Sequence, residues 1–431
     1  MRKFLSFTMS LLLAGMLCAA QTAGTQEQPL PSLDEKLSVS DCIAIALENS
    51  PQAVSARLAV QSAEISVSNA KNRLLPTASA SVSADYANAK SAGTARMSDD
   101  NVGSSIDAGL SISGLTDIGR NIRTQKLALE QSRLRLCEVE NDITVSVKSA
   151  YYALLVAQRT VEIRTQSRDL YQEQYDRTKA FYDEGLRPKV DVTTAEVDLN
   201  NAILSLIRAK NAVKTANAAL ANVMGVQHNN EFLLDDEITT EEFPYTFEQV
   251  LTRAYENRPD VRSSKTSLQI SEIQLTQAKA AYLPTFTLGA SFSKNGDEFR
   301  LDNDSTRLYA GVEIPLFSAF TVRNGVKQAQ INLASAQNSD RSLANNVYLE
   351  VQNAFVKLNE AAESIPVAQS NVGKAKENME LSQGRYNEGI GDMIALKDAQ
   401  IAYTNAELSL LTARFDYAVA LAELKNAMGT K

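Results

Sequence analysis

The chain has 431 residues, of which 44% are hydrophobic, and its 43 basic and 51 acidic side chains give a formal net charge of −8. A negative chain repels the phosphate backbone of nucleic acid, so nucleic acid is excluded as a partner. The only histidine, His228, lies in a polar segment, and the sequence has no Gly-rich phosphate loop. We therefore expect no enzyme activity, no metal and no cofactor.

The first twenty residues have the pattern of a secretory signal peptide. Arg2 and Lys3 precede an apolar run that ends at Leu17, and small residues follow up to Ala20. Acylation at Cys18 is the alternative, but Leu17 stands where such signals need a small residue. Residues 21–37 are polar and rich in proline, and they are predicted to form a flexible leader. The other two cysteines, Cys42 and Cys137, are predicted to be buried thiols within helices.

Nearly all of the remaining chain is one unit written twice. The segment from Gly185 to Gly225 recurs from Gly389 to Gly429, 204 residues later, and Pro51 recurs as Pro259. Such self-similarity is typical of a duplicated structural unit. We expect a first repeat at 38–225, a connecting loop at 226–245 and a second repeat at 246–429.

Each repeat begins with two helices. Ser40 is predicted to cap a short helix before Pro51, and a second helix is expected from Pro51 to Leu75 because proline is tolerated at a helix start. In the second repeat, Thr246 and Gln249 form a capping-box pattern, and Pro259 opens the equivalent helix.

A strand pair follows these helices in each repeat. Apolar and polar residues alternate in residues 77–114 and again in 285–317, which is the spacing of strands with one apolar and one polar face. The pattern predicts four strands in two hairpins. Each strand is about nine residues long, close to the ~9–11 that cross a bilayer at a tilt.

Long helical hairpins complete each repeat, at 120–224 and 324–428. The stretch from Arg120 to Asp183 contains no proline or glycine and would span roughly 100 Å as a helix. We expect the returning helix from Asp191 to Met224 and the helix from Pro51 to Leu75 to stack end to end beside this long one, and the second repeat to follow the same plan. Pro366 is expected to kink the second long helix. The apolar positions form narrow seams that suit coiled-coil pairing, so the chain needs further copies of itself.

These features together resemble the TolC-like outer-membrane efflux proteins, also called outer membrane factors. The resemblance covers residues 38–429 and rests on the duplicated plan, the Leu-Pro-Thr segments, the exit at Pro315 and the Tyr-x-x-Gly tips. It implies an α+β membrane protein, in which a long α-helical coiled-coil barrel joins a 12-stranded transmembrane β-barrel. A homotrimer with four strands per chain would form both.

The resemblance also implies a location and partners. The protein would lie in the outer membrane, in contact with its lipid, and would extend far into the periplasm. It would be the channel of a tripartite efflux or type I secretion system, with a periplasmic adaptor (membrane fusion) protein and an inner-membrane pump as partners.

The helical tips are where the resemblance places functional residues. It implies that the adaptor docks at Gly185, Leu186, Gly389 and Ile390. It also implies a gate or entrance lined by Asp398 and Asp191. A capping role for Asp191 and a solvated position for Asp398 are the alternatives.

The chain departs from the family pattern at these tips. Ala395 replaces an expected aspartate, and Gly391 stands where an arginine is expected, two residues after Gly389. The two tips are therefore unequal, and we expect the entrance to open asymmetrically within each subunit.

One competing function remains open at the level of sequence. A non-transporting elongated coiled-coil scaffold or adhesin of the envelope would explain the long helices. It would not explain amphipathic hairpins at matching places in both repeats.

Overall fold

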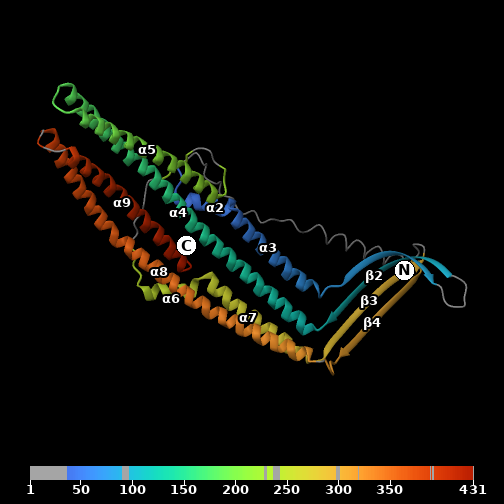
Figure 1. Ribbon diagram of the computed structural model, residues 1–431. Coiled ribbons are helices and arrows are strands. Elements are labelled where there is room, and N and C mark those ends of the chain that lie inside the picture. Colours follow the sequence, from blue (N-terminus) through green and yellow to red (C-terminus); the bar gives the residue numbers. More distant parts are fainter. Residues whose placement is uncertain are drawn as a thin grey trace.

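The computed structural model describes residues 36–89, 97–227, 231–235, 243–297, 301–318, 320–388, 390 and 393–430. In these parts the chain is elongated, with a sheet at one end and two helical tips at the other (Figure 1). The predicted signal peptide, most of the predicted leader and His228 lie outside the described residues.

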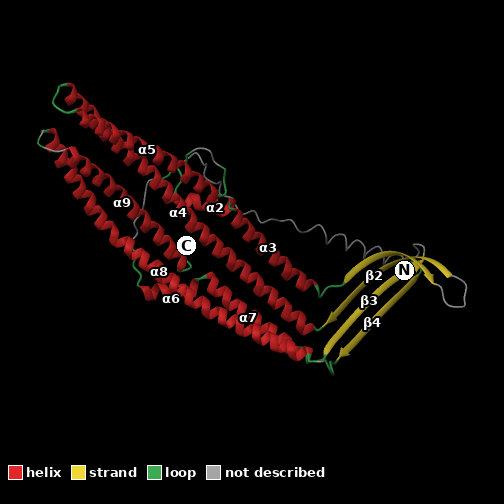
Figure 2. Cartoon of the chain, in the orientation of Figure 1, coloured by secondary structure: helices red, strands yellow, loops and turns green. Residues whose placement is uncertain are grey.

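The two repeats have the same order of elements, two helices, two strands and two long helices (Figure 2). The first repeat consists of α2 (Val39–Asn49), α3 (Pro51–Asn72), β1 (Thr77–Ala89), β2 (Met97–Ser113), α4 (Leu115–Asp183) and α5 (Lys189–Met224). The second consists of α6 (Phe247–Asn257), α7 (Pro259–Ala280), β3 (Thr285–Asp297), β4 (Asn303–Glu313), α8 (Thr321–Asn387) and α9 (Met393–Ala427). The internal duplication is therefore present in the fold as well as in the sequence.

The four strands form one antiparallel sheet in the order β1-β2-β3-β4. Its register places apolar residues opposite each other, as in the row of Ile112, Leu288 and Ala310. A row on the opposite face contains Gly109, Ser291 and Arg307. Because side chains alternate between faces, one face of the sheet is apolar and the other polar, as the alternation predicted.

Hydroxyl groups link neighbouring strands across the polar face. The Oγ atoms of Ser81 and Ser105 lie 2.8 Å apart, and those of Ser293 and Ser305 are also 2.8 Å apart. None of the helices in the described part of the chain combines the length and apolar character needed to cross a lipid bilayer.

The two short helices of the first repeat meet α5 at a corner. Gly225, at the end of α5, has a φ of +70°, and a Cβ added there would lie 2.7 Å from the carbonyl oxygen of Asn49. Only glycine permits both this left-handed conformation and this close approach. The end of α5 thus abuts the start of α3, and the two helices run one after the other beside α4, as expected.

The second repeat builds the same corner with an added ionic cluster. Gly429 has a φ of +70°, and a Cβ there would lie 2.7 Å from the nitrogen of Arg258. The Arg258 guanidinium donates to both carboxylate oxygens of Asp260, at 3.0 and 2.7 Å, and lies 2.9 Å from a carboxylate oxygen of Glu350. It also donates to the carbonyl of Ala427 at 3.2 Å, which ties α9 to the corner.

A small hydrophobic core lies at each corner. In the first repeat, α2 packs on α4 and α5 around Tyr151, which is 1% exposed. The Tyr151 hydroxyl lies 3.0 Å from the carbonyl of Leu37 and accepts a hydrogen bond from the Asp235 N–H, also at 3.0 Å. In the second repeat, α6 packs on α8 and α9 around Val250 and Leu424.

Several details differ from the sequence-based predictions, including the strands, which have 11 to 17 residues rather than about nine. The first short helix is capped by Ser38 rather than Ser40, because Asp41 completes a capping box with Ser38. The first long helix begins at Leu115 rather than Arg120, since Gly114 has a φ of +62° and turns the chain directly from strand to helix. Cys42 is buried, but Cys137 is only half-buried. The second long helix, α8, is one continuous helix from Thr321 to Asn387 that includes Pro366, and the kink expected at Pro366 stays a prediction.

The corner at Gly225 can be tested against the tip glycine Gly185, which has a φ of +75° but no atom within 4 Å of an added Cβ. Both substitutions to alanine should cost about 1–2 kcal/mol for the left-handed backbone. Gly225→Ala should lower the thermal unfolding temperature further, because its Cβ meets Asn49 and Ser50. Circular dichroism of the two variants measures this, and equal melting temperatures would contradict the corner contact.

Candidate functional site at the helical tips

The two helical hairpins end in tips that expose an apolar residue. At the first tip, Gly185 turns the chain with positive φ, and the Leu186 N–H donates to the carbonyl of Phe181 at 2.8 Å. Leu186 is 67% exposed, and Ile390 at the second tip is 75% exposed. Gly389, the other predicted docking residue, lies outside the described residues.

Arg187 connects the two tips. Its guanidinium lies 3.8 Å from a carboxylate oxygen of Asp191 and 5.4 Å from the ring centroid of Tyr386. A guanidinium over an aromatic face at this distance forms a favourable cation–π contact. Tyr386 comes from α8 and is 1% exposed, so Arg187 covers a buried ring of the other repeat.

Further polar contacts join the same two hairpins just behind the tips. Arg177 on α4 donates to the side chain of Asn387, and the hydroxyls of Thr178 and Tyr386 lie 3.4 Å apart. Gln174, one turn earlier, donates to Thr178 at 3.3 Å. Because Gln174, Thr178 and Tyr386 are all buried, this seam between the repeats is hydrogen-bonded.

The two predicted entrance aspartates have different surroundings. Asp191 is half-buried beside Arg187 in the first turn of α5, where a negative charge interacts favourably with the helix dipole. The residue that caps this helix is Pro188, not Asp191. Asp398 is exposed on α9. Among the described residues, no hydrogen bond or ion pair joins Asp191 to Asp398.

A partly buried ion pair lies next to Asp398, and the sequence did not predict it. The Lys397 ammonium on α9 donates to Asp198 on α5 at 2.7 Å, and the Asp198 side chain is only 9% exposed. The two residues are 199 positions apart, so no local pattern announces the contact. Burial, followed by the negative charge of Asp198, raises the pKa of the neighbouring Tyr171.

The ion pair lies in a small chamber between α4, α5 and α9. The chamber has a volume of about 220 Å³, and its lining includes Ser167 and Tyr171 on α4, Asp198 on α5, and Ile401 and Thr404 on α9. The second hairpin of the chain thus inserts polar side chains into a groove of the first hairpin.

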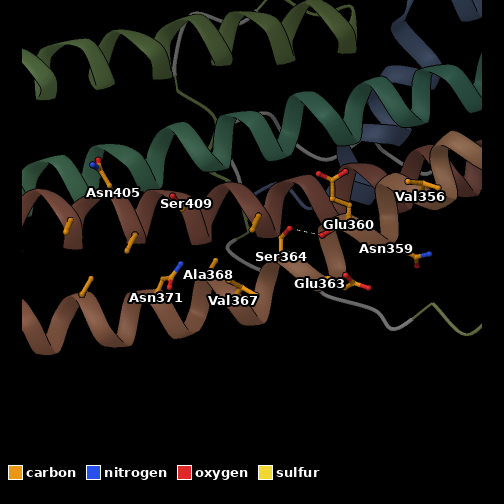
Figure 3. Close-up of a pocket in the computed structure, with 14 residues that line it drawn as sticks. Val356, Asn359, Glu360, Glu363, Ser364, Val367, Ala368, Asn371, Asn405 and Ser409 are labelled. Carbon is orange, nitrogen blue, oxygen red and sulfur yellow. Dashed lines mark hydrogen bonds between the residues drawn. The ribbon is translucent and has the colours of Figure 1, made fainter.

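A wider groove lies between α8 and α9, lined by residues from Val356 to Ala375 of α8 and from Ala402 to Ala413 of α9 (Figure 3). Its volume is about 950 Å³. In Figure 3, Val367, Ala368 and Asn371 of α8 point from one wall of this groove, and Asn405 and Ser409 lie on α9. Its lining is made of small, amide and apolar side chains, with Glu360 and Glu363 at one end.

The chemistry of these contacts is that of reversible association between helices. Among the residues that the structure describes, no group of three or more His, Cys, Asp or Glu side chains is placed to hold a metal ion. An ion pair, a cation–π contact and side-chain hydrogen bonds join the two hairpins of one chain toward their tips.

Comparison with known proteins places this architecture in a family. A family model described as "Outer membrane efflux protein" matches residues 42–226 and 250–430. The outer membrane protein TolC of Vibrio cholerae is 21% identical over 397 residues, which cover 89% of each chain. TolC of Escherichia coli K12 is 22% identical over 307 residues, but this match spans only 62% of its length and 68% of the present chain.

Solved structures with the same fold are outer membrane channels. The Campylobacter jejuni CmeC channel superposes with a TM-score of 0.76 at 17% identity, over 91% of this chain and 85% of CmeC. The open state of the Neisseria gonorrhoeae MtrE channel gives a TM-score of 0.74 at 21% identity, over 91% of this chain and 89% of MtrE.

Proposed function

This chain belongs to the outer membrane efflux protein family, and we propose that three copies of it form a duct through the outer membrane. The duct receives substrates from an inner-membrane pump and a periplasmic adaptor. Its sheet lies in the membrane, and its helices extend into the periplasm. Efflux and type I secretion both require such an outlet.

The amphipathic sheet is the observation that carries this proposal. Its apolar face is exposed in the single chain, with Leu288 at 62%, Leu308 at 80% and Val312 at 58%. Its outer strands, β1 and β4, each have only one partner. A sheet in lipid must pair every strand edge, which requires closure into a barrel. Three copies of four strands supply a closed barrel with the apolar faces outward.

The total exposed surface supports assembly as well. The chain exposes 28247 Å². A compact monomer of 46.9 kDa exposes roughly 16,000 Å². A chain with this much exposed surface has area to contribute to contacts with neighbouring copies, lipid and the adaptor in the proposed assembly.

We place the entrance of the duct at the helical tips. The polar seam behind Arg187 holds the two hairpins of each copy together in a closed state. Leu186 and Ile390 are exposed apolar side chains, one at each tip, next to Gly185 and Gly389 in the sequence. Their exposure supports docking of the adaptor at these residues.

Conductance in planar lipid bilayers tests the duct. We expect discrete single-channel currents from the purified protein. A non-transporting scaffold or adhesin would give none, and the absence of channels at several protein concentrations would overturn the proposal.

The same recordings test Asp398 as an entrance residue. Three copies of this exposed carboxylate would form a ring that attracts divalent cations. Asp398→Ala should raise the concentration of Mg²⁺ that half-blocks the current several-fold. Asp191→Ala is the matched comparison, and it should have a smaller effect because Arg187 already offsets the charge of Asp191. Unchanged block in Asp398→Ala would remove this residue from the entrance.

Arg187→Ala should favour the open entrance. The variant loses a cation–π contact worth about 0.5–1 kcal/mol and a partly exposed ion pair worth up to about 1 kcal/mol. A loss on the order of 1.4 kcal/mol shifts a closed–open equilibrium about tenfold. The open fraction of channel recordings measures this shift, with Arg177→Ala as a second variant of the seam. A mean current equal to that of the unmodified protein would show that Arg187 does not restrain the tip.

The orientation of the sheet can be tested with adjacent residues of β3. Ala290 lies on the apolar face and Ser291 on the polar face. An arginine facing lipid near the bilayer midplane costs about 2–4 kcal/mol. Ala290→Arg should therefore reduce the amount of folded protein in the outer membrane, whereas Ser291→Arg should be tolerated. The reverse ranking would place the polar face against lipid.

A further inference from the structure

Each repeat has a groove between its two long helices, but another helix of the same chain fills only the groove of the first repeat. Positions in the chamber between α4 and α5 recur 204 residues later in the open groove between α8 and α9. Ser167, Tyr171 and Ser205 in the chamber correspond to Asn371, Ala375 and Ser409 in the groove. The groove of the first repeat receives α9 of the same chain, and about 220 Å³ remain enclosed. The groove of the second repeat has an open volume of about 950 Å³.

Helix α5 shows the complementary difference. On α9, Gln400 is 4% exposed and Thr404 is 8% exposed, because this face packs on the first hairpin. Their counterparts on α5, Glu196 and Asn200, are exposed. The same face of α5 leaves apolar side chains uncovered. These are Val197 at 54%, Ile203 at 37%, Leu204 at 51% and Ile207 at 50% exposure.

One chain therefore has two complementary surfaces that it does not itself bring into contact. The exposed face of α5 corresponds to the face that α9 buries, and the open α8/α9 groove corresponds to the groove that α9 fills. Two different complementary surfaces on one molecule generate a ring when copies associate head to tail and the rotation closes.

We propose that the groove between α8 and α9 receives α5 of a second copy, in the register that α9 adopts in the first hairpin, and that this seam between copies lacks a counterpart of the Lys397–Asp198 ion pair. The register places Thr193, Val197 and Asn200 of one copy where Lys397, Ile401 and Thr404 lie within a chain. The proposal rests on the trimer proposed above and adds which surfaces meet.

The missing ion pair follows from the two residues that replace it. Lys397 corresponds to Thr193, and Asp198 corresponds to Ala402. In the proposed register a threonine of one copy therefore faces an alanine of the next. The seam within a chain has the 2.7 Å contact between Lys397 and Asp198, so the seam between copies is the weaker of the two at this position.

Paired cysteines test the register directly. Thr193→Cys with Ala402→Cys, treated with a short bis-maleimide in a Cys137→Ser background, should give dimers and trimers on a denaturing gel. The pair Asp198→Cys with Lys397→Cys is the matched control and should link only within a chain. Burial raises the pKa of Cys42 to about 12, so this remaining thiol should not react.

The native mass of the same samples separates the two proposals. A trimer that gives no ladder with Thr193→Cys and Ala402→Cys would overturn the register and leave the groove to another protein. A monomer would overturn the trimer itself.

Transfer of the ion pair tests the unequal seams. Thr193→Lys with Ala402→Asp rebuilds the pair between copies and should raise the temperature at which trimers dissociate in detergent. The like-charge control, Thr193→Asp with Ala402→Asp, should lower it. Identical dissociation temperatures for the two double variants would show that residues 193 and 402 do not face each other across the seam.

Discussion

The close approach of two backbone segments at Gly225, repeated at Gly429, is the contact on which both halves of the molecule depend. At each corner the end of one long helix meets the start of a shorter one, with too little room for any side chain at the glycine. This contact aligns α3 after α5 and α7 after α9. Each pair can then run beside a single helix of 69 or 67 residues, α4 or α8. Without the corners, the long helices would have no continuous partner.

The two corners also concentrate the apolar core, and this has a consequence for the tips. Tyr151, Val250 and Leu424 lie in small cores around the short helices. Farther along the hairpins, buried positions include Gln174 and Thr178, which form hydrogen bonds at the seam with Tyr386. A hydrogen-bonded seam exchanges its partners for water at a modest net cost, since each bond contributes only about 0.5–1.5 kcal/mol. The tips are thus the part of the molecule best suited to reversible opening.

The sequence predicted the elements that depend on local patterns. Alternation identified all four strands, and the prolines at positions 51 and 259 marked the starts of α3 and α7. The capping box of Thr246 and Gln249 is present, with a 3.1 Å hydrogen bond. The first cap was assigned to the wrong serine, because Ser38 and Ser40 both precede the helix and only Asp41 three residues after Ser38 distinguishes them.

The contacts between repeats could not be predicted in the same way. Lys397 and Asp198 meet because of the rotation and register of two helices that are far apart in the sequence, and neither residue has a local signature. The contact of Arg187 with Tyr386 did leave a signal. The arginine expected two residues after Gly389 is absent, but an arginine stands two residues after Gly185 in the other repeat. Comparison of the repeats at an offset of 204 residues would have identified Arg187 as the candidate.

The same comparison shows positions at which one repeat has a charged residue in a contact and the other repeat has a neutral residue. Arg187 corresponds to Gly391, Lys397 to Thr193, and Asp198 to Ala402. In each case the charged member takes part in a contact between the two hairpins of one chain, and its counterpart is neutral. If hairpins alternate around a ring, equal repeats would give six equal seams. In the proposed ring, the differences at these positions give three ionic seams within chains and three neutral seams between them. Both kinds of contact lie toward the tips, away from the glycine corners, so separation at the tips need not disturb the corners or the sheet.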